Sequence, residues 1–293
     1  TAVILINDPD FYGQEPALFK GKAMTYYGRW TYKYEEAMRQ GAAGALIVHD
    51  TAPAAYGWDV VRNSNTGPQL DAESADGNMQ RVPIEGWIQL DVAKKIFALA
   101  GQDFDALHAA ARRPGFKPVP LDAKATVGVR NLVRRANSAN AIAVLPGTKR
   151  PDEYVVYMAH WDHLGKAVGV GGAGSGADGV FNHGAVDNAT GVAGNLEIAT
   201  AFAGGAKKPE RSLVFLAVTA EESGLLGSLY YGRHPVFPHA RTAAVINIDA
   251  LPPYGRTRDL EVIGYGASQL EDYLKEAAAK QGRVLKPDSQ AEK

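Results

Sequence analysis

The chain has 293 residues, of which 46% are hydrophobic and 22% are charged, a composition typical of a folded globular protein long enough for two domains. Its 31 basic and 32 acidic residues nearly cancel, which gives no electrostatic reason to expect a nucleic-acid or membrane partner. Because the chain has no cysteine, disulfides, a thiolate nucleophile and cysteine-bound zinc are excluded, and any metal must be held by histidine, aspartate or glutamate.

The N-terminal part predicts a β-rich module with a few helices. Thr1 opens directly on an apolar run at 2–6, as in a mature or trimmed protein, and no apolar stretch approaches the roughly 20 residues of a membrane span. A second apolar run at 45–48 follows a predicted helix that begins at Thr31 and ends at Gly41. We expect a long surface loop next, over 51–81, before strand character resumes at 82–84.

Prolines mark a predicted domain boundary, which we place after residue 118. Beyond it, a predicted helix at 191–202 lies among apolar runs that predict strands buried on both faces. Residues 119–293 are therefore expected to form an α/β domain with a central, mostly parallel or mixed sheet flanked by helices. Ligand sites in such sheets lie beyond the carboxyl ends of the strands. The four predicted strands cover residues 141–145, 154–158, 213–218 and 243–248.

A histidine and a carboxylate follow the strand predicted at 154–158. His160 and Asp162 are two residues apart, so they emerge on one side of an extended chain. His160 could then bind a metal while Asp162 accepts the proton of the other ring nitrogen. A surface turn would explain the same pair equally well, and His163 is a weaker candidate for a ligand.

Acidic residues follow the remaining elements. Asp187 precedes the predicted helix and could cap it or bridge two cations. Glu221 and Glu222 follow the third strand; with a turn after them, one could bind a metal while the other takes a proton, although both also suit a helix N-terminus. Asp249 is a charged residue beside the apolar fourth strand. If it is buried, its carboxylate needs a partner such as a cation; otherwise it lies at the edge of a loop.

Together these strand ends form a much more specific pattern than any one of them. Nitrogen and oxygen ligands without sulfur suit zinc, with manganese or cobalt as replacements. A bridging carboxylate would place two metals about 3.5–4 Å apart, an arrangement typical of hydrolysis.

The ordered motifs resemble those of the di-zinc aminopeptidase family, which includes bacterial leucyl aminopeptidases and relatives of glutamate carboxypeptidase II. The resemblance covers roughly residues 120–293 and implies a peptidase that acts at a chain end, with two zinc ions activating a water. The motifs are His160-x-Asp162, Asp187-Asn188-Ala189-Thr190-Gly191, Glu221-Glu222 and Asn247-x-Asp249.

The resemblance also implies the role of each residue. His160 and Asp249 would bind one zinc and Glu222 the other, with Asp187 bridging both. Glu221 would be the general base, and Asp162 would support the site from behind the ligands. The family often has a cis peptide bond after the bridging aspartate, so we expect one between Asp187 and the next residue.

Residues 1–118 resemble the protease-associated domain that many of these enzymes carry. The resemblance rests on Gly21-Lys22-Ala23, on the helix with Glu35-Glu36-Ala37 and on residues 41–48. It implies a module that borders the substrate cleft or contacts partners and has no chemistry of its own.

One departure from the family concerns the second zinc site. The family completes it with a histidine beyond the last aspartate motif, and none of the seven histidines follows Asp249. The chain also ends in a polar segment at 290–293. We therefore expect an incomplete catalytic domain that binds one zinc well and the second poorly, and that could be inactive unless a separate C-terminal segment supplies the missing histidine.

Two other functions are compatible with parts of the pattern. One is a glutaminyl-cyclase-like acyltransferase with a single zinc, and the other is a non-catalytic, receptor-like binding module. The glycine pattern at 174–179 neither follows a strand nor opens a helix, so we interpret it as a flexible loop and not as a dinucleotide site. An aminopeptidase is favoured over a carboxypeptidase because no arginine is placed to bind a substrate carboxylate. The family's frequent export in bacteria implies a secreted or periplasmic protein.

Overall fold

The computed structural model describes residues 1–13, 24–165, 181–262 and 268–287. Contacts divide the chain into two compact units, one of residues 1–64, 74–130 and 256–293, and one of residues 65–73 and 131–255. The boundary predicted after residue 118 lies within a stretch, 116–140, that forms neither helix nor strand. The domain ranges themselves stay a prediction.

The first unit contains a parallel sheet of three short strands with helices between them. Parallel neighbours need a crossover connection, and helices supply it here. The strand order is β1-β2-β3, and β2 pairs in parallel with both neighbours. The strands are β1 (Ala2–Leu5), β2 (Ala45–His49) and β3 (Glu85–Gln89), and the helices are η1 (Tyr26–Gly28), α1 (Trp30–Arg39), α2 (Thr51–Ala54), α3 (Trp58–Ser64), α4 (Leu90–Leu99) and α5 (Phe104–Ala111).

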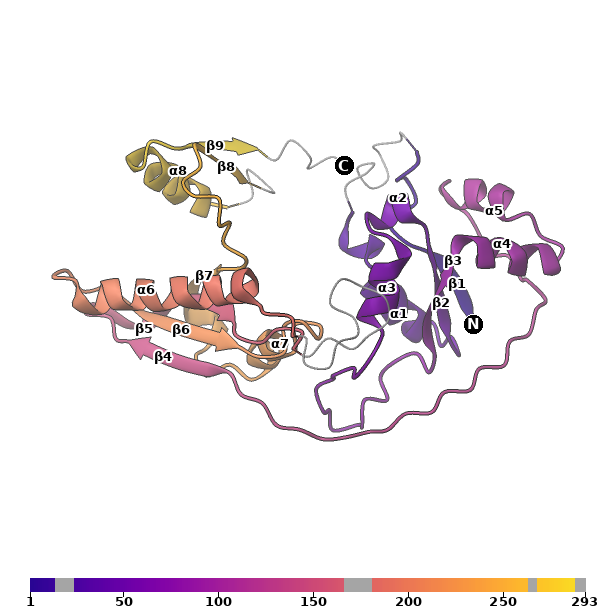
Figure 1. The fold of residues 1–293 in the computed structure, drawn as a ribbon, viewed down its shortest axis with the longest axis horizontal. Helices are drawn as coiled ribbons and strands as arrows, with labels where there is room; N and C mark the ends of the chain where they lie inside the picture. The colour runs from indigo at the N-terminus through magenta and orange to yellow at the C-terminus, as the bar shows by residue number, and fades with distance from the viewer. Residues whose placement is uncertain (14–23, 166–180, 263–267, 288–293) are drawn as a thin grey trace. The chain divides into compact units, whose positions relative to one another are not determined.

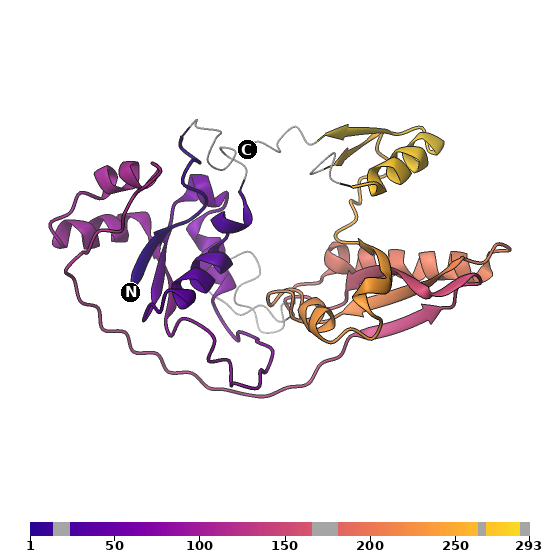
Figure 2. The same cartoon turned by 180° about the vertical axis from the view of Figure 1, so that it is seen from behind.

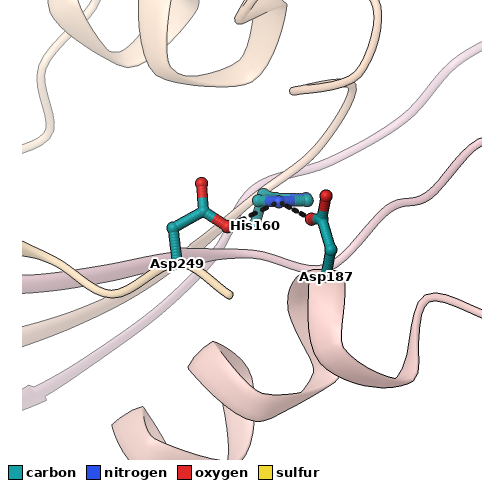
Figure 3. A group of neighbouring side chains, drawn as sticks. All are labelled: His160, Asp187 and Asp249. Carbon is teal, nitrogen blue, oxygen red and sulfur yellow. Dashed lines mark ion pairs between the residues drawn. The ribbon is translucent and has the colours of Figure 1, made fainter. Parts of the chain in front are cut away.

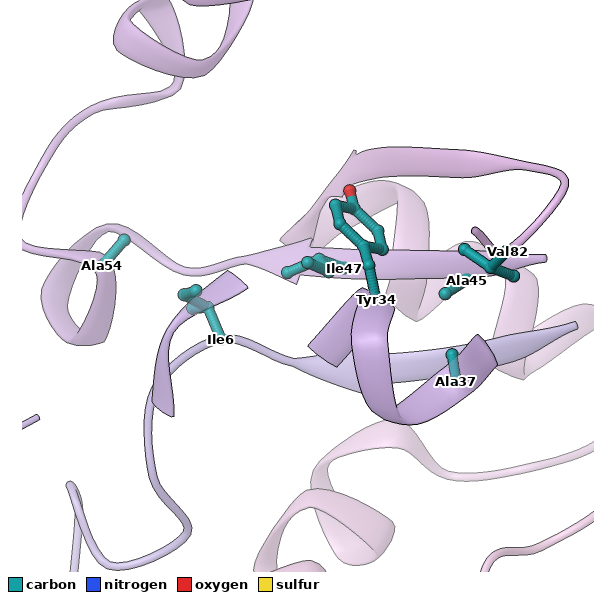
Figure 4. Packing of buried hydrophobic residues seen from close by; sticks show 7 residues of the cluster. All are labelled: Ile6, Tyr34, Ala37, Ala45, Ile47, Ala54 and Val82. Atoms are coloured by element: carbon teal, nitrogen blue, oxygen red, sulfur yellow. The ribbon is translucent and has the colours of Figure 1, made fainter. Parts of the chain in front are cut away.

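Side chains of this sheet alternate between two faces, and each face packs on different helices. On one face, Ile47 lies in a buried cluster with Tyr34 of α1 (Figure 4). On the other face, Val48 packs with Ala93 of α4 and Phe104 of α5. Helices therefore cover both faces of the small sheet.

This part of the chain is more helical than the β-rich module that we expected, because each parallel crossover requires a helix. The helix predicted from Thr31 is present as α1, but its N-cap residue, Arg29, makes no capping hydrogen bond through its side chain. The loop predicted over 51–81 includes α2 and α3, and strand character predicted at 82–84 is found instead in β3. Two sequences discussed above, 21–23 and 174–179, lie outside the described residues.

The second unit contains a mixed sheet of four strands in the order β4-β6-β5-β7. The strand β4 is antiparallel to β6, whereas β5 is parallel to both β6 and β7. The mixed α/β fold with helix-flanked sheets is as predicted. The strands are β4 (Ala141–Leu145), β5 (Arg150–His160), β6 (Arg211–Val218) and β7 (Thr242–Asn247), and the helices are η2 (Ala185–Ala189), α6 (Thr190–Gly204), α7 (Leu226–Arg233) and η3 (His239–Arg241).

The two central strands bury opposite faces against different helices. Tyr157 of β5 stacks on Phe215 of β6 and approaches Phe202 of α6. The neighbouring residue Val156 faces the other way, into a cluster that includes Tyr231 of α7. Figure 1 shows α6 lying along this sheet, and Figure 2 shows the same layers from behind.

The outer strands are less buried than we expected. Ile142 of β4 is 36% exposed and Val245 of β7 is 51% exposed. The prediction that all four strands are buried on both faces was therefore wrong for β4 and β7. The described helices α6 and α7 pack over β5 and β6, so the apolar outer strands lie beyond their cover.

The last described elements form a small parallel pair of strands connected by a helix. They are β8 (Asp259–Val262), α8 (Leu270–Lys280) and β9 (Val284–Pro287). Across the described ranges, no helix is both long enough and apolar enough to span a bilayer.

Candidate metal centre

The carboxyl ends of three parallel strands meet at one edge of the second unit's sheet and bring the predicted ligands together. His160 is the last residue of β5, and 2% of its side chain is exposed. Asp249 follows shortly after β7, and Asp187 lies in η2. The N-cap of α6 is Ala189, so Asp187 does not cap that helix. The peptide bond between Asp187 and Asn188 is cis, as predicted.

His160 lies between two carboxylates. Its Nε2 atom is 3.0 Å from Asp187 Oδ1 and 3.4 Å from Asp249 Oδ1 (Figure 3). The Nε2 atom is buried, yet among the described residues it has no hydrogen-bond partner. One ligand atom from each of the three residues lies within 4.8 Å of the others, a spacing that could hold a metal ion.

A second group of potential ligands shares Asp187 with the first. It consists of His163, Asp187 and Glu222, again with ligand atoms within 4.8 Å of one another. His163 Nδ1 lies 2.5 Å from Glu222 Oε1. The sequence placed His163 below the other candidates and left Glu222 and Asp187 as the protein groups of this site, whereas the structure adds a histidine to them.

Glu221 lies beside the first group without belonging to either. Its Oε2 is 3.8 Å from His160 Nε2, and 28% of its side chain is exposed. Burial raises the pKa of Glu221, and the neighbouring carboxylates, Glu222 first, raise it further against the opposing effect of His160. Burial alone would lower the pKa of His160, but the surrounding carboxylates, with Glu221 first, outweigh it and raise that pKa.

Asp162 supports the site in a different way from the one predicted. The acceptor for His160 Nδ1 is the backbone carbonyl of Asp162, at 3.1 Å, and not its carboxylate. The carboxylate instead accepts backbone N–H bonds from Glu221, at 3.0 Å, and Glu222, at 3.3 Å. Asp162 thereby fixes the turn that carries both glutamates, because it binds the backbone of each one.

The glutamate turn itself was predicted. In a continuing strand the two side chains would point to opposite faces, so the chain has to turn for both to reach one site. Ala220 has φ of 52° and Gly224 has φ of 96°, and the carbonyl of Glu221 accepts bonds from Gly224 and Leu225. This turn lets both glutamates face the site.

Asn188 is a supporting residue whose role the sequence did not reveal. It is 3% exposed, and its Nδ2 donates to the carbonyl of Ile248 at 3.0 Å. Its Oδ1 accepts from the N–H of Gly191, at 2.9 Å, and of Ala250, at 3.2 Å. Since Ile248 and Ala250 flank Asp249, this one side chain connects the backbones beside two candidate ligands.

These residues suit zinc by their donor atoms. Imidazole nitrogen and carboxylate oxygen are ligands that zinc accepts in proteins, and no sulfur is present. Three buried atoms at the site, His160 Nε2, His163 Nδ1 and Glu222 Oε1, lack hydrogen-bond partners within the described ranges. A buried polar atom without a partner carries a desolvation cost that a bound cation would remove.

An α/β sheet that gathers histidines and carboxylates at the carboxyl ends of its parallel strands is typical of a metallohydrolase. Residues 140–293, more than half of the chain, match the model of Peptidase family M28. The chain therefore belongs to this family of peptidases.

Named relatives agree with the family. The chain is 33% identical over 144 residues to aminopeptidase NAALADL1 of Rattus norvegicus, a match that covers 46% of this chain and 17% of that protein. It is 34% identical over 114 residues to a probable zinc metalloprotease of Pyrenophora teres f. teres, which covers 39% of this chain and 22% of the relative. The matched region is thus a small part of each relative.

Two solved structures resemble the chain more distantly. An M28 peptidase precursor from Shewanella amazonensis aligns with 98% of this chain and 53% of its own, at 18% identity and a TM-score of 0.42. A glutaminyl cyclase from Bacteroides thetaiotaomicron aligns with 50% of this chain and 56% of its own, at 23% identity and a TM-score of 0.38. Neither TM-score is high enough to support an argument about function.

Proposed function

We propose that the chain carries the metal site of a zinc-dependent aminopeptidase. Membership in Peptidase family M28 and relatives named aminopeptidase and zinc metalloprotease support this class of reaction. The observation that carries the two-metal form of the proposal is that Asp187 belongs to both groups of potential ligands. A carboxylate shared between two sets of donors is the arrangement that a bridging ligand requires.

The proposed division of labour follows the two groups. His160 and Asp249 would hold one zinc, Glu222 would belong to the other, and Asp187 would bridge them. Bound zinc would supply Lewis-acid chemistry, polarising the scissile carbonyl and lowering the pKa of water. The residues provide fixed positions for this chemistry, since His160 and Glu222 are held by β5 and by the turn that Asp162 binds.

Glu221 is the proposed general base. It stands in neither ligand group but lies 3.8 Å from His160 at the same edge, so its carboxylate is free to move a proton. Its raised pKa brings it closer to the working pH, where a base both accepts and returns a proton effectively. Glu221 would take a proton from water as the bond to the carbonyl forms and deliver it to the departing amine.

A preference for the amino end of a peptide is supported by the relative named aminopeptidase. Asp187 and Asp249 expose 50% and 42% of their side chains, and bound zinc would offset the charge of both. In the described part of the chain, the ion pairs of the site's carboxylates involve histidines and no lysine or arginine. A carboxypeptidase would need a cationic side chain for the terminal carboxylate of its substrate, and these contacts offer none, in agreement with an aminopeptidase.

The test combines zinc content with substrate preference. Zinc per chain is measured by elemental analysis after dialysis, alongside hydrolysis of amino-acyl chromogenic amides and of their N-acetylated counterparts. The proposal predicts two zincs and turnover of the free amines alone. One zinc without turnover would mean that the His160, Asp187 and Asp249 site is correct but that the second site is incomplete in this chain. Cyclisation of an N-terminal glutaminyl peptide without hydrolysis would instead favour the single-zinc acyltransferase. No zinc after attempted reconstitution would contradict the proposed function and favour a binding module.

A further inference from the structure

A cavity of about 220 Å³ lies in the first unit, at the carboxyl ends of β1 and β2. Ligand sites gather at this edge of parallel sheets. Two basic residues line the cavity, Lys33 of α1 and Arg112, the C-cap residue of α5. Its apolar wall comes from strand side chains and two phenylalanines, namely Val3, Leu5, Val48, Phe11 and Phe116. The cavity therefore combines an apolar wall with two cations.

Neither cation forms an ion pair with a carboxylate among the described residues. Lys33 Nζ donates to the backbone carbonyl of Asn7 at 3.0 Å, and burial lowers the pKa of Lys33, although Asp8 opposes this shift. Arg112 Nη2 donates to Nδ1 of His108 at 2.8 Å, whereas its Nε is buried and has no partner within the described ranges. Burial and the charge of Arg112 lower the pKa of His108, which keeps this imidazole neutral. A buried cation without a counter-ion carries a desolvation cost that a bound anion would reduce.

Two carboxylates also line the cavity, and neutral donors hold both of them. Asp8 accepts from the backbone N–H of Thr25 at 2.7 Å and from its Oγ1 at 3.1 Å. Asp50 accepts from the hydroxyl of Tyr12 at 2.5 Å. The guanidinium of Arg112 lies 4.9 Å from the centre of the Tyr12 ring, so it packs on the face of that ring and not on the carboxylate. The two basic side chains therefore remain available to an incoming anion.

The backbone at the end of β1 fixes the shape of the cavity. Asn7 is 4% exposed and has φ of 67°, a left-handed conformation that turns the chain sharply after the strand. Its Nδ2 donates to the carbonyl of Pro53 at 2.7 Å, and its Oδ1 accepts from the N–H of Asp8 at 2.6 Å. The carbonyl of the same residue holds Lys33. The cavity is thus formed by the fold itself, which lowers the entropic cost of binding a ligand.

We propose that this cavity binds a small carboxylate with an apolar body, held by Lys33 and Arg112. Lysine and arginine form strong charge-assisted hydrogen bonds to carboxylate oxygens, and the buried Nε of Arg112 supplies one donor. The apolar body would pack on Val3, Leu5 and the phenylalanines. A dianion such as phosphate fits less well, because two carboxylates share the lining. Two sources of this chemistry are a free carboxylic acid and a free apolar amino acid, whose ammonium would face those carboxylates.

The test uses the full chain and three probes: isocaproate, leucine and isocaproamide. Isocaproate is leucine without its amino group, and isocaproamide is its uncharged analogue. Isothermal titration calorimetry and ligand-observed NMR measure binding to the wild type, Arg112→Gln, Lys33→Gln and Arg113→Gln. Arg113 is the matched control, since it is the exposed neighbour of Arg112 and does not line the cavity. A zinc chelator is present throughout, so that a carboxylate bound to zinc is not counted.

We expect isocaproate to bind the wild type and Arg113→Gln with the same Kd. The Kd should rise by about 10- to 100-fold in Arg112→Gln, because a charge-assisted hydrogen bond is lost, and Lys33→Gln should have an effect in the same direction. Isocaproamide should bind at least about 10-fold more weakly than isocaproate. Tighter binding of leucine would identify an amino acid as the ligand, whereas tighter binding of isocaproate would identify a free carboxylic acid.

Three results would overturn the proposal. They are no binding of either carboxylate, equal affinity for isocaproate and its amide, and a Kd that changes in neither Arg112→Gln nor Lys33→Gln. Circular dichroism verifies that each variant is folded, and if one cation is needed for folding, the variant of the other gives the answer. None of these measurements depends on zinc content or hydrolysis, so their failure leaves the proposed function in place.

Discussion

Removal of the Asn188 side chain should weaken both the fold and zinc binding. Asn188→Ala deletes one donated and two accepted hydrogen bonds, to Ile248, Gly191 and Ala250. At about 1 kcal/mol for each bond, the free energy of unfolding should fall by about 3 kcal/mol. A loss of 1 kcal/mol lowers Tm by roughly 3–5 °C in a domain of about 100–150 residues, so we expect a decrease of about 10 °C.

The same substitution should also weaken zinc binding, because Ile248 and Ala250 flank Asp249 and Asn188 follows Asp187. We expect zinc affinity to fall by about 10- to 100-fold, as for other residues that orient ligands. Calorimetry gives Tm, and zinc titration gives the affinity. Asn195→Ala is the control: Asn195 is 6% exposed but donates to strand carbonyls at 3.4 and 3.5 Å, away from the ligands. It should lower Tm and leave zinc affinity unchanged. Wild-type zinc affinity in Asn188→Ala would refute the reasoning.

Three further predictions concern the same region. Glu221→Gln should reduce kcat by about 10²- to 10⁴-fold in steady-state assays and leave the zinc content unchanged. Replacement of the exposed Glu197 by glutamine should change neither kcat nor the zinc content. Loss of zinc together with activity in Glu221→Gln would instead make Glu221 a ligand. Gly191→Ala should lower the free energy of unfolding by about 1–3 kcal/mol in denaturant titrations, because its Cβ would lie 2.2 Å from Asn188 Oδ1. Gly204→Ala, in the same helix but in open space, should not be destabilising, and equal losses in both variants would contradict the packing argument. Removal of zinc with a chelator should lower Tm, and zinc at about 1,000 times its Kd should raise the free energy of unfolding by about 4 kcal/mol. If neither the chelator nor zinc changes Tm, the cluster binds no metal in the folded state.

The strands of the second unit were predictable because their sequences are short apolar runs. The run predicted at 141–145 coincides with β4, and the run at 213–218 lies within β6. The first unit was harder, since its third strand is only partly apolar and follows Pro83, which cannot donate to a sheet. The burial of β4 and β7 was overestimated because a run of apolar residues does not reveal how far the covering helices extend.

The candidate ligands were predictable from their places at strand ends, because the parallel strands β5, β6 and β7 bring those ends to one edge. The contact of His163 with Glu222 was not predictable, since strand periodicity places residues 160 and 163 on opposite sides, and the chain leaves β5 at His160. The partners of the Asp162 carboxylate and of Asn188 are backbone groups far away in the sequence, so no local pattern could indicate them.

The most direct test of the two-metal site is anomalous X-ray scattering at the zinc edge from zinc-loaded crystals of this chain. The proposed arrangement predicts two peaks about 3.5–4 Å apart on either side of Asp187. One peak should lie beside His160 and Asp249, and the other beside Glu222. Zinc peaks elsewhere on the protein, with none at these side chains, would contradict the assignment of this site.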